Sequence, residues 1–89
     1  MIQTQVTIIN KLGLHARAAA KLVTTASAFG SRIKVGYPQR MVDGKSIMAV
    51  MMLAASKGTE IVIEAAGDDE QAATDALLDL INRRFDEAE

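Results

Sequence analysis

The chain contains one histidine, His15, and an arginine, Arg17, follows it two residues later. A neutral imidazole has a nitrogen lone pair that can attack phosphorus, and a guanidinium can hydrogen-bond the oxygens of a bound phosphoryl group. A glycine turn at Gly13 precedes this pair, and a helix-forming run begins at Ala16. His15 therefore lies at a predicted helix start, where unpaired backbone N–H groups favour anions and the helix dipole favours the neutral imidazole. These residues predict a site for reversible phosphoryl transfer.

The first 42 residues contain no acidic side chain, and Asp43 is the first carboxylate in the chain. No general-base carboxylate therefore lies within helical reach of His15, and the sequence offers no obvious group that would help water to hydrolyse a phosphorylated histidine. The alternative interpretation is that His15 and Arg17 form an ordinary solvated pair at the surface. Spacing alone does not separate the two interpretations.

Hydrophobic periodicity predicts an α+β fold. Alternating apolar positions predict strands at residues 2–8, 32–37, 40–42 and 59–65. Helical spacing predicts a helix at residues 16–30 and a second helix that begins at Ile47 and is closed by Lys57 and Gly58. A third helix starts after the acidic turn at residues 67–70 and ends at Arg83 and Arg84. The order β-α-β-β-α-β-α, with one apolar stripe on each helix, predicts an open-faced sandwich in which three helices cover one face of a four-stranded antiparallel sheet.

Composition excludes several classes of protein. Apolar residues make up 49% of the 89 residues, enough for one small core, so we expect a single domain over residues 1–89. Because the chain has no cysteine and one histidine, we expect no disulfide, no metal site and no cofactor. The N-terminus lacks the basic start of a signal peptide, and the longest apolar run, residues 47–55, is far shorter than the ~20 residues of a membrane-spanning helix. We expect a cytoplasmic protein that is not embedded in a membrane.

Charge is divided unevenly along the chain, although the net charge is only −1. Residues 1–59 hold eight Lys or Arg and one acid, whereas residues 60–89 hold ten acids and two Arg. The basic part includes His15, which predicts acidic or phosphorylated partners. Nucleic acid is the competing partner class. A pI near 5.8 and only three aromatic residues argue against it, so we expect no nucleic-acid binding.

Residues 10–17 read NKLGLHAR, which closely resembles the phosphorylation-site motif of the HPr family, the histidine-containing phosphocarriers of the phosphoenolpyruvate-dependent phosphotransferase system. The predicted order of elements also resembles the HPr fold over the whole chain. The resemblance implies a carrier rather than an enzyme. His15 would accept a phosphoryl group from phosphorylated enzyme I and pass it to A-type enzyme II components, while Arg17 stabilises the phosphate. Many members have proline after the arginine, and because proline would pre-set the first helical turn, we expect Ala18 to loosen the site slightly.

A second motif lies at residues 44–50, which read GKSIMAV and resemble the segment in which HPr kinase/phosphorylase modifies a serine of many bacterial HPr proteins. The residue that this resemblance implies is Ser46, which the sequence also predicts as the N-cap of the second helix. A phosphate is electrostatically favourable at a helix start, so modification would keep the fold while adding negative charge to a surface that meets acidic partners. We expect this modification to be inhibitory.

The resemblance also implies a docking surface near His15. Val50 and Leu53 of the second helix are predicted to be core residues. So short a helix cannot bury side chains on all of its faces, so its other apolar residues are expected at the surface. Flexible methionine side chains suit a surface that binds several partners. The candidates for partner binding are an apolar group and a basic rim, namely Ala20, Ile47, Met48 and Met51 with Arg17, Lys21 and Lys45.

Two alternatives within this reading of the sequence remain open. One is a regulatory binding module that Ser46 phosphorylation controls, without any phosphate relay. The other is a carrier of the paralogous nitrogen-related branch of the system, whose members look similar. We expect a monomer in each case.

Overall fold

The computed structural model describes residues 1–88, and its elements follow the predicted order. Their bounds are β1 (Ile2–Thr7), α1 (Ala16–Ser27), β2 (Arg32–Tyr37), β3 (Arg40–Asp43), α2 (Ile47–Met51), β4 (Glu60–Ala66), α3 (Glu70–Asn82) and a 3-10 turn, η1 (Arg84–Asp86). The four strands form one antiparallel sheet in the spatial order β1-β4-β2-β3. The predicted fold class is confirmed, whereas the turn η1 was not predicted.

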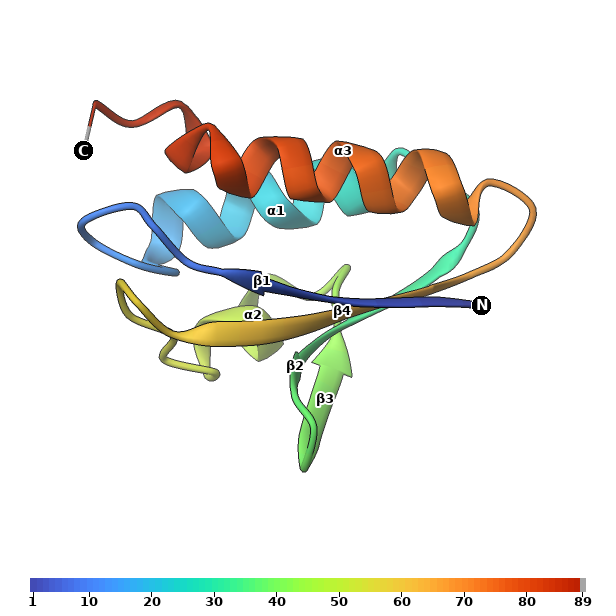
Figure 1. The fold of residues 1–89 in the computed structure, drawn as a ribbon, viewed down its shortest axis with the longest axis horizontal. Coiled ribbons are helices and arrows are strands. Elements are labelled where there is room, and N and C mark those ends of the chain that lie inside the picture. Colours follow the sequence, from blue (N-terminus) through green and yellow to red (C-terminus); the bar gives the residue numbers. More distant parts are fainter. Residues whose placement is uncertain (89) are drawn as a thin grey trace.

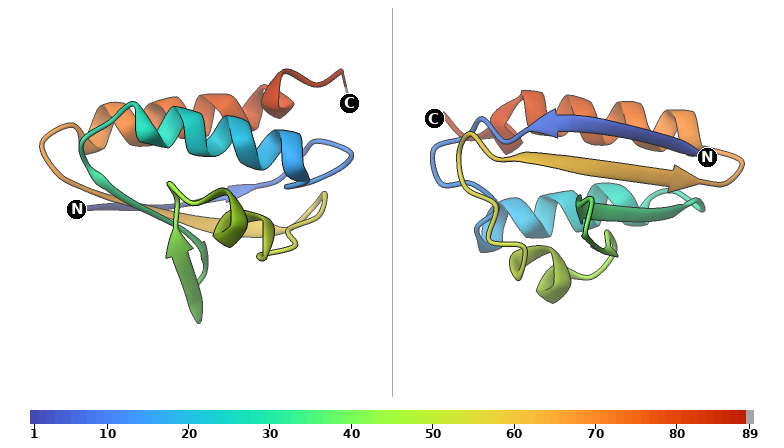
Figure 2. Two further views of the ribbon diagram at one scale, coloured as in Figure 1. Left: turned by 180° about the vertical axis from the view of Figure 1, so that it is seen from behind. Right: turned by 60° about the horizontal axis from the view of Figure 1, so that its bottom comes forward.

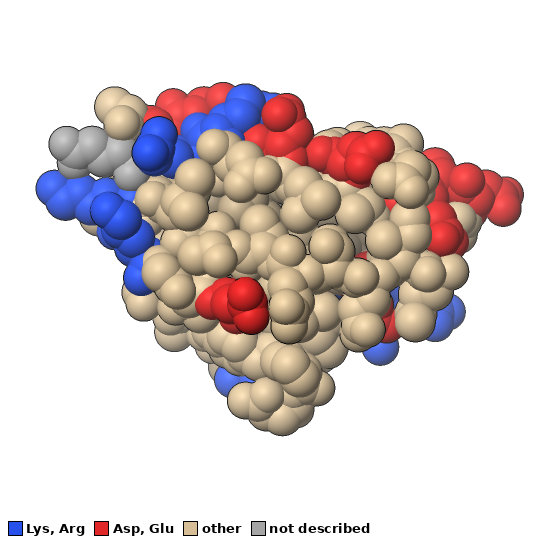
Figure 3. Space-filling view, viewed as in Figure 1, with Lys and Arg blue, Asp and Glu red and all other residues tan. Residues whose placement is uncertain are grey.

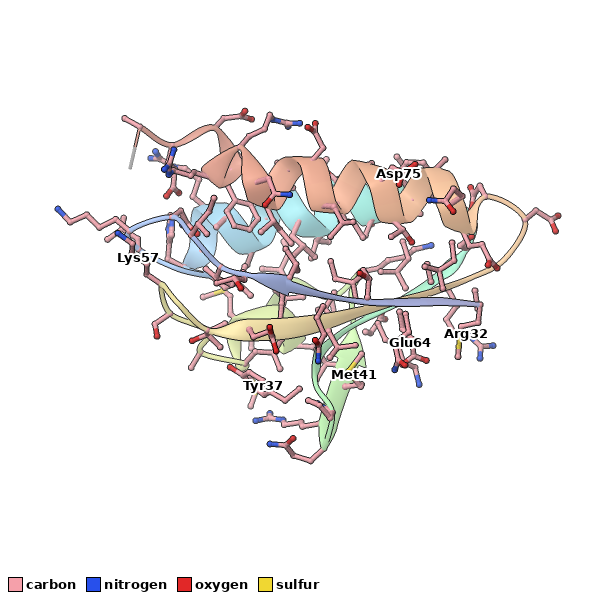
Figure 4. The ribbon with its side chains drawn as sticks, viewed as in Figure 1. Arg32, Tyr37, Met41, Lys57, Glu64 and Asp75 are labelled. Carbon is pink, nitrogen blue, oxygen red and sulfur yellow. The ribbon has the colours of Figure 1, made fainter. Side chains whose placement is uncertain are left out.

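One face of the sheet is apolar because alternating positions of neighbouring strands coincide. Ile63 of β4 pairs with Thr4 of β1 and with Val35 of β2, and both Ile63 and Val35 are fully buried. Side chains one position further along each strand point to the other face. Figure 4 shows Met41 and Glu64 on that second face, away from α1 and α3. The sheet is therefore covered on one side only.

Helices α1 and α3 lie side by side across the apolar face, and α2 packs beside α1 and β3 (Figures 1 and 2). Each long helix directs a stripe of apolar side chains at the sheet. Burying one large apolar side chain contributes about 1.5–3 kcal/mol relative to leaving it exposed. The largest fully buried side chains come from both layers and form one core: Ile8, Leu22, Ile33, Ile61, Ile63, Leu77, Ile81 and Phe85.

Helix α1 ends earlier than predicted, at Ser27 instead of Gly30. The N–H groups of Ala28 and Phe29 bond to carbonyl oxygens three residues back, at 3.2 Å each, which tightens the last turn and ends the α-helix. Helix α2 ends at Met51, well short of the predicted close at Lys57 and Gly58, and the N–H groups of Leu53 and Ala54 again bond to carbonyl oxygens three residues back. Both differences arise from backbone hydrogen bonding that apolar spacing does not encode.

Helix α3 ends at Asn82, short of the predicted end at Arg84, because the chain turns left-handed. Arg84, Phe85 and Asp86 have positive φ angles of 59°, 55° and 64°. This conformation costs non-glycine residues roughly 1–3 kcal/mol each, so other contacts must hold the turn. Phe85 is fully buried in the core, and Lys21 Nζ donates to its carbonyl oxygen at 2.7 Å. The turn redirects the C-terminal segment toward the start of α1.

Asp69 joins the start of α3 to the turn between α1 and β2. Its carboxylate accepts hydrogen bonds from the backbone N–H groups of Gly30 at 2.9 Å and Ser31 at 3.0 Å, and from the Ser31 hydroxyl. These donors, above all the hydroxyl, hold the pKa of Asp69 below its ordinary value of 3.8, although desolvation acts in the other direction. The ionised form of Asp69 therefore stabilises the fold.

Asp69→Ala is expected to lower the free energy of unfolding at neutral pH, because three donors lose their acceptor. Since the native pKa lies below 3.8, the loss should persist above that value and shrink as the pH falls through the native pKa, where the wild-type carboxyl is protonated. Urea unfolding at neutral pH and across the acid range measures the difference. Asp75→Ala, at an exposed position of α3 (Figure 4), is the control. An equal loss at every pH would contradict the assignment.

Candidate functional site

The predicted phosphate site lies where the loop between β1 and α1 meets the C-terminal segment, at the end opposite the N-terminus (Figures 1 and 2). The segment before β4 holds this loop: Gly58 N–H donates to Ile8 O at 2.7 Å, and Leu14 N–H donates to Ala55 O at 2.8 Å. Gly13 has a φ of 67°, and a Cβ there would lie 2.4 Å from the Ala55 carbonyl oxygen. Because only glycine allows this approach, Gly13 fixes the path of the chain into α1.

His15 immediately precedes α1 and has extended backbone angles, with φ −74° and ψ 178°. Its carbonyl oxygen accepts a helical hydrogen bond from the Ala19 N–H at 2.8 Å. The N–H groups of Ala16, Arg17 and Ala18 precede that bond and have no acceptor within the helix. The structure confirms that His15 lies at the positive end of the α1 dipole, and it places the fully buried Ala18 in the first turn.

A carboxylate from a distant segment lies beside His15, although the sequence offers none within helical reach. Glu87 Oε2 lies 2.5 Å from His15 Nε2, and Glu87 Oε1 accepts a hydrogen bond from Asn10 Nδ2 at 3.0 Å. The His15 and Glu87 side chains are 28% and 15% exposed, respectively. They are 72 positions apart in the sequence, so no local pattern could reveal the contact. The left-handed turn at Phe85 brings them together.

The contact with Glu87 distinguishes the two ring nitrogens of His15. Burial raises the pKa of Glu87, but hydrogen bonds from Asn10 and His15, together with the charges of His15 and Arg17, outweigh burial and hold this pKa below 4.5. Glu87 is therefore ionised at neutral pH. Since a carboxylate only accepts hydrogen bonds, Nε2 carries the proton of the contact. In the neutral ring, Nδ1 then holds the available lone pair.

His15 and Arg17 line the same open pocket, which has a volume of about 670 Å³. Arg17 is exposed and has no ion pair with any other residue in the described part of the chain, so its guanidinium can turn to a ligand in the pocket. Leu12 also lines the pocket and is 66% exposed. Leu12 was not predicted as a site residue, although an apolar residue inside the histidine motif could have indicated a contact surface.

Basic side chains gather at this end of the molecule. Figure 3 shows Lys and Arg side chains clustered there, beside the largely uncharged surface over β1 and β4, and Figure 4 labels Lys57 among the side chains at this end. Lys11, Lys57 and Arg84 come from three separate loops and line one hollow next to the His15 pocket. This cluster agrees with the excess of basic residues predicted around the histidine.

The two lysines predicted for the basic rim are bonded to backbone carbonyl groups. Lys21 Nζ donates to Phe85 O at 2.7 Å, and Lys45 Nζ donates to Phe29 O at 2.8 Å. Lys21 thereby secures the C-terminal turn, and Lys45 ties the segment before α2 to the end of α1. Both side chains are partly exposed, and their part in docking stays a prediction.

Helix α2 separates core from surface as predicted. Val50 and Leu53 are buried, whereas Met48, Ile47 and Met51 are 73%, 44% and 39% exposed. The neighbouring apolar side chains of Ala20, which is half-buried, and Met52, which is 61% exposed, also reach the surface. Met52 was not among the predicted docking residues.

Ser46 is the N-cap of α2, as predicted. Its Oγ accepts a hydrogen bond from the Ala49 N–H at 3.3 Å, and its carbonyl oxygen accepts one from the Val50 N–H at 3.0 Å. The residue is half-buried. Part of the Ser46 side chain is therefore at the surface while its oxygen caps the helix.

Both the sequence and the fold of this chain are similar to those of known proteins. Residues 2–83 match the family model described as the PTS HPr component phosphorylation site. The phosphocarrier protein HPr of Pseudomonas aeruginosa is 58% identical over 86 residues, 96% of each chain. The phosphocarrier protein NPr of Shewanella violacea is 41% identical over 87 residues, 98% of this chain and 96% of its own. The crystal structure of HPr-C-His from Thermoanaerobacter tengcongensis has a TM-score of 0.95 at 46% identity over the whole of both chains.

Together with the fold, these matches define a phosphocarrier of the phosphotransferase system, a protein that carries a phosphoryl group and is not itself an enzyme. The chain belongs to the HPr family. The family and the fold that the histidine motif implied are thereby confirmed. Within residues 1–88, no helix has the length and apolar character needed to cross a membrane.

His15→Ala is expected to raise the pKa of Glu87, because it removes a hydrogen bond and a neighbouring charge that lower this pKa while leaving the Asn10 bond in place. Carbon-13 NMR titration of the Glu87 carboxyl carbon measures the change. Glu70, whose pKa is lowered by the Gly67 N–H and by the N-terminus, is the internal control and should not move. If the Glu87 titration is the same in both proteins, the His15–Glu87 contact does not form in solution.

Proposed function

We propose that this phosphocarrier accepts a phosphoryl group on His15 from phosphorylated enzyme I and passes it to A-type enzyme II components. One observation carries the proposal. His15 Nε2 faces Glu87, which leaves Nδ1 free at the start of α1, in a pocket that Arg17 also lines. We further propose that residues 1–89 act as a single cytoplasmic domain, as a monomer and without a cofactor.

The proposed transfer needs only this chain's own groups and a donor phosphohistidine. The Nδ1 lone pair of His15 forms the new bond to phosphorus, while the bond from phosphorus to the donor nitrogen breaks and that nitrogen keeps the electron pair. The unpaired N–H groups of the first α1 turn and the Arg17 guanidinium can hydrogen-bond the phosphoryl oxygens. Because Ala16 and Arg17 at the start of this turn are exposed, the site stabilises the adduct without enclosing it, which suits onward transfer.

Partner docking is proposed for the surface formed by α2 and the neighbouring side of α1. Its apolar part is Ala20, Ile47, Met48 and Met51, and its basic rim is Arg17, Lys21 and Lys45. Exposed methionine side chains can adapt to differently shaped partners. This surface adjoins the side of α1 that begins at His15, so a bound partner can reach the imidazole.

His15→Ala is expected to abolish labelling by phosphoenolpyruvate and enzyme I, whereas the wild-type chain should acquire an acid-labile phosphate. Arg17→Ala should still be labelled, but roughly tenfold more slowly, because it loses one charge-assisted hydrogen bond to the transferred group. Lys34→Ala removes an exposed cation from β2 and is the matched control. Phosphate that appears equally on His15→Ala would place the acceptor elsewhere.

Ser46→Ala tests the proposed regulation by HPr kinase/phosphorylase. The variant should lose ATP-dependent labelling by this kinase while phosphorylation through enzyme I continues. Because the change also removes the N-cap, we expect it to cost about 1 kcal/mol of stability. Ser56→Ala, at an exposed serine outside the helices, is the control. Kinase labelling that survives in Ser46→Ala would exclude this serine.

The nitrogen-related branch is the second candidate, because the NPr of Shewanella violacea is also similar to this chain over nearly its whole length. Its identity of 41% is lower than the 58% of the Pseudomonas aeruginosa HPr. The serine segment at residues 44–50 also favours a carrier under HPr kinase control. Transfer from the labelled chain to purified A-type components of each branch distinguishes the two candidates.

A further inference from the structure

Asn10 is a fully buried polar residue in the loop that leads to His15. Its Nδ2 donates to Gly13 O at 2.8 Å and to Glu87 Oε1 at 3.0 Å. Its backbone carbonyl oxygen accepts from the Gly13 N–H at 3.2 Å. The amide group thus closes the turn before the histidine and reaches the C-terminal segment at the same time.

Glu87 bridges Asn10 and His15 with its two oxygens. Oε1 accepts from Asn10 Nδ2, while Oε2 accepts from His15 Nε2 at 2.5 Å. With one oxygen held from each side, the carboxylate has a defined orientation. Glu87, which is itself fixed by Asn10, therefore orients the His15 imidazole.

The two hydrogen-bond acceptors beside Asn10 determine which way its side-chain amide points. Gly13 O and the Glu87 carboxylate are both acceptors, so the position requires two N–H donors. In this orientation the Asn10 Oδ1 atom is buried and has no hydrogen-bond partner among residues 1–88. An orphaned buried acceptor is unfavourable, so the two donated bonds outweigh it. An aspartate side chain of the same size would have no hydrogen to donate.

The C-terminal turn holds Glu87 in place. Phe85, two residues earlier, is fully buried, and Lys21 bonds to its carbonyl oxygen. Asp86 accepts from Arg83 Nε at 3.0 Å, which closes the turn. Glu87 is thus presented to His15 from an anchored backbone.

We infer that Asn10 and Glu87 act together as a positioning pair for His15, which keeps the proton on Nε2 and the ring turned so that Nδ1 meets the incoming phosphorus. The inference rests on the proposed function of His15. Neither residue touches the transferred group. Glu87 acts through the imidazole, and Asn10 acts through Glu87.

The pair has a defined part in the proposed transfer. As Nδ1 forms its bond to phosphorus, the proton stays on Nε2 and the ring acquires positive charge. The Glu87 carboxylate compensates that charge, and no proton has to leave or enter. On transfer to the next protein, the bond between Nδ1 and phosphorus breaks, Nδ1 keeps the electron pair and a neutral ring returns. The leaving group is therefore a neutral imidazole whose proton stays on Nε2 and is still hydrogen-bonded to the Glu87 carboxylate.

The first test measures the state of the ring directly. Nitrogen-15 NMR of the His15 imidazole should show the tautomer protonated on Nε2 in the wild type. Glu87→Ala and Glu87→Gln should both shift the spectrum toward a mixture of the two tautomers, because neither variant keeps a carboxylate at Nε2. Glu60→Gln removes the same charge from an exposed position of β4 and should leave the spectrum unchanged.

The second test measures reactivity without a partner protein. Phosphoramidate transfers its phosphoryl group to histidine, with ammonia as leaving group. Glu87→Ala should react roughly tenfold more slowly at His15, the effect typical of losing the partner that orients a functional histidine. With enzyme I as donor, the loss should fall on the maximal rate and leave the donor concentration for half-maximal rate unchanged.

The third test asks whether Asn10 acts through Glu87. Asn10→Ala should shift the tautomer mixture in the wild-type background and have no further effect in Glu87→Ala, so the two changes are not additive. Asn10→Asp keeps the side-chain size without the donors and should behave like Asn10→Ala if the loop is intact. The Gly13 amide signal reports whether the loop keeps its structure.

The outcomes separate this inference from the proposed function. If the Glu87 and Asn10 variants keep the wild-type tautomer and react within about twofold of its rate, the positioning pair is wrong even if enzyme I labels His15. If enzyme I does not label His15 at all, the proposed function is wrong, whatever the spectra show. Additive effects of the Asn10 and Glu87 changes would reduce Asn10 to a residue that only supports the loop.

Discussion

The burial of the apolar sheet face under α1 and α3 is the constraint on which the site depends. The inner side chains of β4 and β2 and the stripes of both long helices form one core, so the helices cannot shift independently. His15 immediately precedes α1, and Phe85 joins the same core just beyond α3. Because one core anchors both segments, residues 72 positions apart meet at hydrogen-bonding distance. The histidine is thus placed by packing that lies well away from it.

Two backbone segments with positive φ angles, Gly13 and the turn after α3, turn this general constraint into a specific geometry. Gly13 passes so close to Ala55 that no side chain fits, and the turn after α3 runs through three left-handed residues that are not glycine. The strain at Phe85 is offset by burial and by the Lys21 bond. Gly13 directs the chain toward α1, and the turn directs Glu87 back to His15. The site is therefore built from connecting segments held by a rigid scaffold.

The helix starts differ in how their N–H groups are satisfied. Ser46 caps α2 with its hydroxyl, and the first turn of α3 contains Glu70, whose carboxylate accepts a hydrogen bond from the Gly67 N–H in the preceding loop. Helix α1 has no acid in its first turn, and His15 makes no capping hydrogen bond with its side chain within the described chain. The carboxylate near this helix start binds Nε2 instead. These contacts leave the dipole end of α1 available to an external anion, as a transient phosphoryl adduct requires.

The sequence by itself determined the order of the strands and helices, the core stripes, the start of α1 directly after His15 and the cap at Ser46. Each of these depends on spacing along a few turns or on one residue's local hydrogen bond. The tertiary structure alone decided that Glu87 lies against His15, that Asn10 holds Glu87, and that carbonyl groups bind Lys21 and Lys45. It also ended α3 before Arg84. The physical reason is that these contacts join distant segments, and their partners are chosen by how the helices pack on the sheet.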